Sequence, residues 1–193
     1  HGVAFNVAGG THHAYADRGE GFCLLNDVAV AANYLLDEGL SRKILVIDLD
    51  VHQGNGTAVL FRGEPRVFTF SMHGGENYPL HKENSDLDLE LPTGCRDDEY
   101  LTKLRATLPH LLDEHQPDFL FFIAGVDVLA GDKLGKLALT RDGCRERDRL
   151  VLTEAKIRQL PVVVTMGGGY SARLANIVEA HCNTYRVAVG LFE

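Results

Sequence analysis

The stretch KILVIDLDVHQGNG, residues 43–56, runs from an unbroken apolar segment directly into acidic, imidazole and amide side chains. Its first part, residues 43–48, has four consecutive apolar residues, three of them β-branched, which is typical of a strand buried on both faces of a parallel sheet. Four more segments share this composition, namely residues 3–7, 66–72, 118–125 and 161–166. The sequence therefore predicts a mostly parallel sheet.

Helical periodicity separates several of these strands. The predicted helices cover residues 26–39, 97–116, 141–160 and 171–182. Asn26 is a capping residue at the start of the first helix, and Pro109 predicts a kink or break in the second. Residues 74–94 are polar and rich in turn formers, so we expect a long loop there. Alternating strands and helices indicate an α/β fold of three layers, with the mostly parallel sheet flanked by helices.

The composition limits the class of protein. The 193 residues carry a formal net charge of −8, which argues against direct nucleic-acid binding and against a membrane surface as partner. No apolar run reaches the length of a membrane span, and no signal-peptide pattern is present. Four scattered cysteines indicate free thiols in a reducing compartment. We therefore expect a cytoplasmic protein, or a nuclear one in a eukaryote.

Polar side chains follow every predicted strand at its carboxyl end. They are the segments Gly9–His13 and Asp48–Asn55, then Ser71 and His73, Asp127 and Asp132, and Gly167–Tyr170. Ligands of open parallel sheets bind outside the carboxyl ends of the strands, so these groups are expected to meet at one edge. One His or Asp after a strand is more often a loop residue or a helix cap, and the prediction of a site rests on their convergence.

Asp50 and His52 form the strongest local pattern, because residues two apart in an extended chain point the same way. A carboxylate oxygen and an imidazole nitrogen then face one point, with Asp48 on the same side. A third ligand from another strand end, such as Asp132, would complete an open metal site of the catalytic kind. Zinc suits these ligands, although oxygen and nitrogen ligands also suit Fe(II), Co and Mn.

Four ordered motifs carry a family resemblance across essentially the whole chain. They are GGTHHAYADRGEGFCLLND (9–27), VIDLDVHQGNGTA (46–58), AGVDVLAGDKLGKL (124–137) and MGGGY (166–170). In order and spacing they resemble the histone deacetylase / acetylpolyamine amidohydrolase family, most closely its class IV branch and bacterial relatives. The resemblance implies an arginase/deacetylase-like fold, with residues 1–193 forming a single deacetylase-like catalytic domain.

The resemblance also implies two metal ions, one catalytic zinc and one potassium close to it. The implied zinc ligands are Asp50, His52 and Asp132. The implied potassium ligands are the side chains of Asp48 and Ser71 with the backbone carbonyls of Asp50, His52 and Met72.

The implied catalytic roles fall on the paired histidines and a tyrosine. His13 is the general base and later the general acid, beside His12, an electrostatic neighbour held by Asp48. Tyr170 donates to the carbonyl oxygen of the substrate. The implied substrate channel is lined by Gly21 and Phe22, by Tyr78 opposite them, and by Gly168 and Gly169 beside Tyr170.

The sequence departs from the family pattern in two places. Asn55, the expected partner of one of the two histidines, stands where many members carry Asp, and an amide stabilises an imidazolium less than a carboxylate does. The family's N-terminal portion, which includes a strand and part of the channel rim, would precede residue 3, and we expect it to be lacking here.

These features predict a zinc-dependent amidohydrolase that removes acetyl or longer acyl groups from lysine side chains or related amines by metal-activated water. Acetylated polyamines and small acetylated metabolites are alternative substrates. A binuclear manganese ureohydrolase is disfavoured, because Gly54 and Leu129 stand where its second metal would require aspartates. An inactive acyl-binding module is the alternative outside enzymes.

Overall fold

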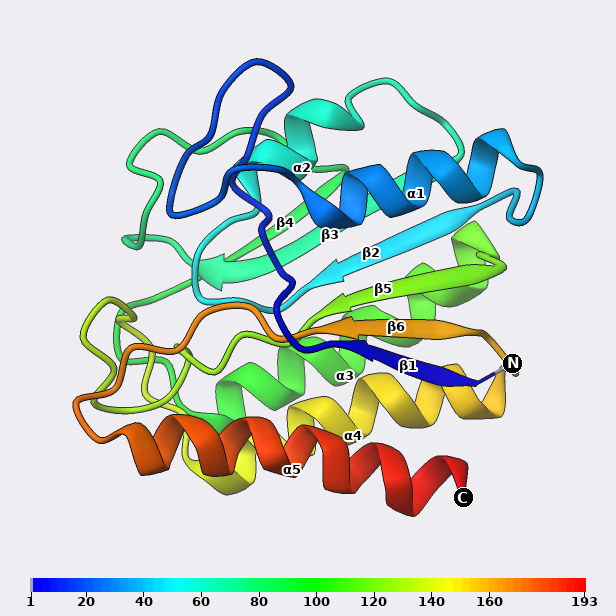
Figure 1. The fold of residues 1–193 in the computed structure, drawn as a ribbon. Helices are drawn as coiled ribbons and strands as arrows, with labels where there is room; N and C mark the ends of the chain where they lie inside the picture. The colour runs from blue at the N-terminus through cyan, green and yellow to red at the C-terminus, as the bar shows by residue number, and fades with distance from the viewer. Residues whose placement is uncertain (1) are drawn as a thin grey trace.

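The five apolar segments form strands of one sheet, as predicted, and a sixth strand joins them. The computed structural model describes residues 2–193. The strands are β1 (Val3–Asn6), β2 (Ile44–Asp48), β3 (Val67–Gly74), β4 (Leu87–Leu91), β5 (Phe119–Ile123) and β6 (Val162–Thr165). Their order is β1-β6-β5-β2-β3-β4, and every neighbouring pair is parallel (Figure 1). This confirms the predicted parallel sheet.

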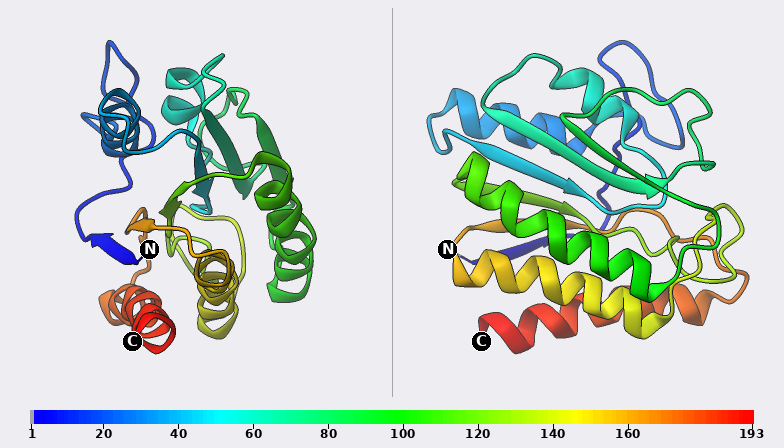
Figure 2. Two further views of the ribbon diagram at one scale, coloured as in Figure 1. Left: turned by 90° about the vertical axis from the view of Figure 1, so that its right-hand side faces the viewer. Right: turned by 180° about the vertical axis from the view of Figure 1, so that it is seen from behind.

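Helices cover both faces of the sheet. They are α1 (Asp27–Asp37), α2 (Asn55–Leu60), α3 (Asp97–His115), α4 (Arg141–Ile157) and α5 (Leu174–Phe192). Figure 2 shows α1 on one side of the sheet and α3 and α4 on the other. Alternate residues of β2 explain this division: Ile44 and Val46 pack with α1, whereas Leu45 and Ile47 join the larger core under α3, α4 and α5. The predicted three-layer fold is therefore confirmed.

Several boundaries differ from the sequence-based expectations. The predicted loop at 74–94 contains β4, whose sequence LDLEL alternates because an edge strand is not apolar at every position. Pro109 does not break α3, which continues to His115. The short helix α2 was not predicted, and α5 runs ten residues beyond the predicted end at residue 182.

The strand ends lie level at one edge of the sheet. Asp48, the last residue of β2, is the register partner of Ser71 in β3 and of Ile123, the last residue of β5. Ile123 is in turn level with Thr165 at the end of β6. The loops that follow these strands therefore gather at the left of Figure 1. Within residues 2–193, no helix combines the length and apolar character that crossing a membrane requires.

Candidate active site

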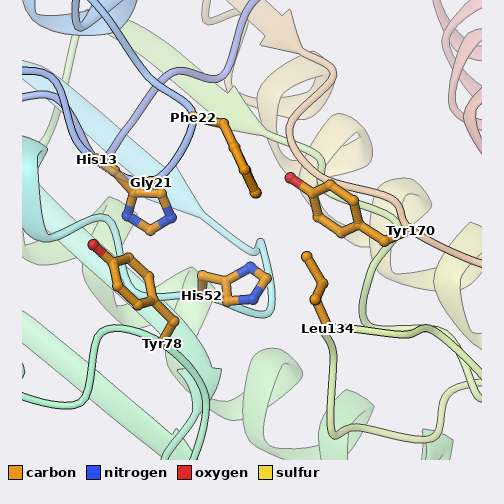
Figure 3. A pocket seen from close by; sticks show the side chains of 7 residues that line it. All are labelled: His13, Gly21, Phe22, His52, Tyr78, Leu134 and Tyr170. Carbon is orange, nitrogen blue, oxygen red and sulfur yellow. The ribbon is translucent and has the colours of Figure 1, made fainter.

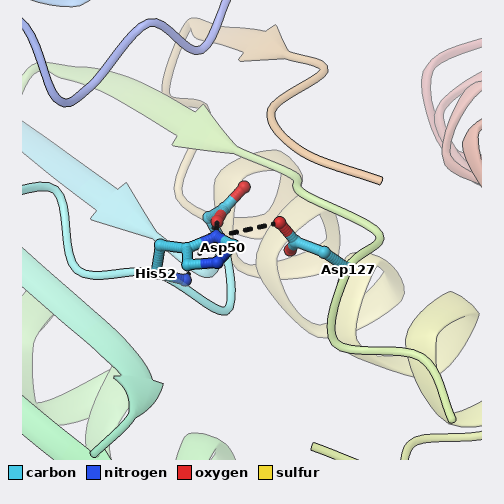
Figure 4. A group of neighbouring side chains, drawn as sticks. All are labelled: Asp50, His52 and Asp127. Atoms are coloured by element: carbon cyan, nitrogen blue, oxygen red, sulfur yellow. Dashed lines mark hydrogen bonds and ion pairs between the residues drawn. The ribbon is translucent and has the colours of Figure 1, made fainter. Parts of the chain in front are cut away.

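Two carboxylates and one imidazole converge at the carboxyl edge of the sheet. Asp50 and His52 follow β2, and Asp127 follows the neighbouring β5 (Figure 4). One potential ligand atom from each lies within 4.8 Å of the others, and all three residues are buried. His52 Nδ1 is 3.0 Å from Asp50 Oδ1 and 3.2 Å from Asp127 Oδ2. The geometry is that of a cluster that could hold one metal ion.

The electrostatics of this cluster fit a cation. Among the described residues, Asp127 Oδ2 is buried and accepts no well-aligned hydrogen bond, although His52 Nδ1 lies 3.2 Å away; such an oxygen is costly to bury unless an ion or proton compensates it. Burial and the neighbouring Asp50 raise the pKa of Asp127 to about 7. Burial alone would lower the pKa of His52, but Asp127 and Asp50 raise it to about 10. The two carboxylates therefore favour positive charge at their centre.

The predicted ligand Asp132 does not belong to this cluster. Its Oδ1 accepts hydrogen bonds from the backbone N–H groups of Leu134 and Gly135, each at 2.9 Å, and its Oδ2 accepts one from Tyr170 N–H at 2.6 Å. Asp132 lies in the turn beyond the strand end, where its carboxylate organises that turn and the Tyr170 loop. The cluster that could hold a metal therefore contains Asp127 in the place where the sequence analysis expected Asp132.

The paired histidines point to different partners, and their rings lie 4.1 Å apart between centroids. His12 Nδ1 is 2.6 Å from Asp48 Oδ2, and His13 Nδ1 is 2.7 Å from Asn55 Oδ1. Burial would lower the pKa of His12, but Asp48 raises it to about 9. Burial and the adjacent His12 lower the pKa of His13 to about 3. His12 is therefore charged at neutral pH, and His13 is neutral.

Asn55 connects His13 to two side chains that the sequence analysis missed. Its Nδ2 donates to Glu20 Oε1 at 2.9 Å and to the Tyr15 hydroxyl at 3.0 Å. The Tyr78 hydroxyl donates to the same Glu20 oxygen at 2.5 Å. This hydrogen bond lowers the pKa of Glu20, so the carboxyl is ionised.

A pocket of about 320 Å³ opens onto these groups (Figure 3). It is lined by His13, Gly21, Phe22, His52, Tyr78, Leu134 and Tyr170. The structure thus brings the predicted channel residues Gly21, Phe22 and Tyr78 together with two of the predicted reactive residues. Leu134 was not predicted. Gly21 is required at its position, because its φ is +53° and a Cβ would overlap the His13 ring.

The two predicted channel glycines behave differently. Gly168 N–H donates to Asp50 Oδ2 at 2.7 Å, and a Cβ at this position would overlap the Asp127 carboxylate. Gly168 also lines a second hollow that continues behind the cluster. Gly169 packs against Val126 and is not among the residues that line either space. Gly168 therefore lets its loop approach the cluster, whereas Gly169 serves packing.

The wall that carries Tyr78 is organised by one ammonium group. Lys82 Nζ donates to the backbone carbonyls of Gly75 at 3.1 Å, Asn77 at 2.7 Å and Pro79 at 2.6 Å. Asn77 Nδ2 in turn donates to the backbone carbonyl of Leu134 at 2.7 Å. The two loops that supply Tyr78 and Leu134 to the pocket are therefore tied together.

A buried ion pair on α4 contacts both loops that carry the cluster. Arg147 and Asp148 are both fully buried, with Arg147 Nε 2.8 Å and Nη2 2.7 Å from Asp148 Oδ1. Arg147 Nη1 also donates to the carbonyl of Leu49 at 3.2 Å and to that of Gly125 at 2.5 Å. Leu49 precedes Asp50, and Gly125 lies two residues before Asp127. Arg147 therefore joins the two loops that carry the cluster.

Three of the residues expected to bind potassium, Asp48, Ser71 and Met72, lie on the adjacent strands β2 and β3, and Asp50 and His52 follow β2. Asp48 and Ser71 are register partners, so their side chains leave the same face of the sheet. Asp48 Oδ1 accepts a hydrogen bond from Asp50 N–H at 3.1 Å, and Ser71 Oγ is 2.9 Å from His73 Nδ1. Met72 is fully buried and belongs to the larger core. Asp48 and Ser71 therefore place two oxygen-bearing side chains on the same face of neighbouring strands.

The all-parallel sheet with flanking helices matches the arginase/deacetylase-like fold of two solved structures. The family model "Histone deacetylase domain" matches residues 1–185. The chain therefore belongs to the histone deacetylase domain family, which confirms the resemblance.

Individual relatives agree with this assignment. An uncharacterized protein of Picosynechococcus is 50% identical over 97% of this chain, and Histone deacetylase 2 of Arabidopsis thaliana is 34% identical over 92%. The crystal structure of the HDA15 HD domain aligns with a TM-score of 0.79 and 28% identity over 96% of the chain. The crystal structure of an acetylpolyamine aminohydrolase from Burkholderia pseudomallei aligns with a TM-score of 0.78 and 28% identity over 98% of the chain. The chain spans 63%, 46%, 57% and 56% of these four proteins, respectively.

Proposed function

We propose that residues 1–193 form a catalytic unit that hydrolyses acyl-lysine side chains and holds one zinc ion through Asp50, His52 and Asp127. The observation that carries the proposal is that His52, one member of this cluster, lines a pocket that His13 and Tyr170 also line. When bound, zinc lowers the pKa of water and polarises an amide carbonyl as a Lewis acid. Two carboxylates and one imidazole suit such an open catalytic site.

His13 is the group that we propose to move the proton. Its Nδ1 is engaged by Asn55 Oδ1, which leaves Nε2 free to accept a proton from the attacking water. The same nitrogen then gives that proton to the amine nitrogen as the C–N bond breaks, so that the products are a carboxylate and a free lysine amine. Burial lowers the pKa of His13, and the neighbouring positive charge of His12, held by Asp48, lowers it further, so His13 is unprotonated before the reaction.

Tyr170 is proposed to donate a hydrogen bond to the substrate carbonyl oxygen as negative charge develops there. Burial and the carboxylates of Asp50 and Asp127 raise the pKa of Tyr170, so the hydroxyl keeps its proton at neutral pH. Its backbone is restrained by the hydrogen bond to Asp132. A protonated, restrained hydroxyl is what an oxyanion donor requires.

The walls of the pocket favour an aliphatic acyl-lysine over an acetylated polyamine. Phe22, Tyr78 and Leu134 supply apolar surface, and within residues 2–193 no carboxylate lines this pocket. A polyamine chain would bring a second ammonium group into the channel without a counter-charge, which is unfavourable in a partly buried site. The methylene stem of lysine carries no such group.

We also propose a potassium ion beside the cluster, held by Asp48 and Ser71 with the backbone carbonyls of Asp50, His52 and Met72. The shared face of Asp48 and Ser71 supports this site. Hard cations of this kind prefer oxygen ligands.

The experiment is a panel of lysine peptides carrying acyl groups from acetyl to myristoyl, assayed beside acetylated polyamines. Turnover of lysine peptides that a chelator abolishes, with one zinc per chain by atomic absorption, is expected. Two metal equivalents would favour the ureohydrolase alternative. Peptide binding without turnover would favour an acyl-binding module, and faster hydrolysis of polyamines would overturn the proposed substrate class.

A further inference from the structure

A chain of three hydrogen-bonded side chains reaches from the surface of the pocket rim to His13. Glu20 Oε1 accepts from Asn55 Nδ2 at 2.9 Å, and Asn55 Oδ1 is 2.7 Å from His13 Nδ1. Asn55 is almost fully buried, and Glu20 lies in the loop before Gly21 and Phe22. The carboxylate and the imidazole are thus connected through a single amide.

Because Glu20 is a carboxylate, the hydrogen bonds that connect it to His13 can be oriented in only one way. Ionised Glu20 can only accept hydrogen bonds, so the amide of Asn55 must present its NH₂ group to it. The carbonyl oxygen of Asn55 then faces His13 Nδ1, which must carry the proton of a neutral ring. The opposite amide orientation would place two oxygen atoms 2.9 Å apart, with one of them charged.

Tyr15, the second neighbour of the Asn55 amide, does not determine the orientation of that amide. Its hydroxyl accepts from Asn55 Nδ2 at 3.0 Å, but a hydroxyl can donate as well as accept. The contact from Tyr15 to Glu83 Oε1 is 3.4 Å, which is too long to fix the hydroxyl hydrogen firmly. Of the two side chains that contact the Asn55 amide nitrogen, Glu20 can only accept hydrogen bonds, so Glu20 is the one that excludes the reversed orientation of this amide.

We propose that Glu20 is a positioning residue that sets the tautomer of His13 through Asn55. The proton is held on Nδ1, and Nε2 remains available to the pocket. The proposal rests on the proposed role of His13 as general base. Through Tyr78, whose hydroxyl donates to the same oxygen, Glu20 also holds one wall of the pocket.

The test compares Glu20→Gln and Glu20→Ala in the zinc-loaded protein. ¹⁵N NMR of labelled histidines reports which ring nitrogen of His13 carries the proton, independently of catalysis. In the wild type we expect the Nδ1–H form. Glutamine keeps the size of Glu20 and an acceptor for Tyr78, but its amide can also donate. The amides of residues 20 and 55 can therefore both rotate by 180°, which would present the NH₂ group of Asn55 to His13. We therefore expect a mixture of tautomers in both variants.

Activity provides the second measurement. If the two amide orientations become equally populated, kcat falls about twofold, and it falls further if the proton settles on Nε2. KM in Glu20→Gln should stay within about twofold, because the hydrogen bond to Tyr78 is retained. Asp17→Asn is the matched control: it neutralises an exposed carboxylate of the same loop, which pairs with Arg18.

A rescue variant makes the test specific. In Asn55→Asp, an acceptor-only group contacts His13 directly, so the tautomer no longer depends on residue 20. Glu20→Gln in that background should leave His13 in the Nδ1–H form. The proposal is overturned if Glu20→Gln alone leaves the His13 spectrum unchanged, or if Asn55→Asp fails to rescue it. Absence of turnover in the wild type would defeat the proposed function, while the NMR result would still decide the role of Glu20.

Discussion

Replacing Arg147 with methionine tests how strongly α4 braces the cluster. Arg147 and Asp148 are both fully buried, and Arg147 also donates to the carbonyls of Leu49 and Gly125. Removing one member of a buried ion pair costs about 3–5 kcal/mol, because the remaining charge loses its partner. Thr184 still donates to Asp148 at 2.7 Å, but a hydroxyl does not neutralise the charge. We expect Arg147→Met to lower the free energy of unfolding by about this amount.

The measurement is urea-induced unfolding followed by circular dichroism, supported by thermal melting. For a chain of this length, each kcal/mol corresponds to about 2–4 °C, so the midpoint should fall by roughly 6–20 °C. Arg149→Met is the matched control on the same helix. Arg149 forms an exposed pair with Glu146, and such pairs contribute about 0–1 kcal/mol.

The double variant Arg147→Met/Asp148→Leu separates charge from geometry. It removes the unpaired carboxylate, so most of the lost stability should return. Zinc affinity should stay weakened, because the carbonyls of Leu49 and Gly125 are no longer held together. A loss below about 1 kcal/mol in the single variant, against the expectation for a buried pair, would refute this reasoning. A double variant no more stable than the single one would refute it equally.

Three further predictions concern the proposed site. Asp127→Ala should lose bound zinc by atomic absorption, whereas Asp132→Ala should retain one equivalent; the reverse pattern would restore Asp132 as a ligand. Tyr170→Phe should lower kcat by about 10²–10³ with little change in KM, and an unaffected kcat would exclude it as the oxyanion donor. Asn55→Asp places a carboxylate beside His13 and raises its pKa. Since the base form is lost as pH falls through that pKa, the acidic limb of the pH–rate profile should move to higher pH, and an unmoved limb would contradict this explanation.

The sequence was sufficient to predict the sheet and the edge at which the site lies. Continuous apolar runs define buried parallel strands, and polar residues at five strand ends can meet only at their carboxyl edge. The edge strand β4 escaped detection because its sequence alternates. The pair Asp50 and His52 was predictable from their spacing alone.

The third ligand position was not predictable in the same way. Asp127 and Asp132 both follow β5, and spacing along a loop does not determine which carboxylate turns inward. Only the turn geometry decides this, because Asp132 satisfies the backbone N–H groups of its own loop. Glu20 and Arg147 were missed for a related reason. Asn55 lies 35 residues from Glu20, and the backbone carbonyls that Arg147 binds lie 98 and 22 residues from it. A charged residue in a loop or helix is usually predicted to lie on the surface.

The wall of the pocket depends on a lysine that must itself remain unmodified. Lys82 gathers three backbone carbonyls of the Tyr78 loop around one ammonium group. Acylation of that amine would remove its charge and leave one N–H in place of three donors. At least two carbonyls would then lose their partner, and the loop would lose its internal cross-link. A protein proposed to remove acyl groups from lysine thus contains, beside its own channel, a lysine whose acylation would disable that channel.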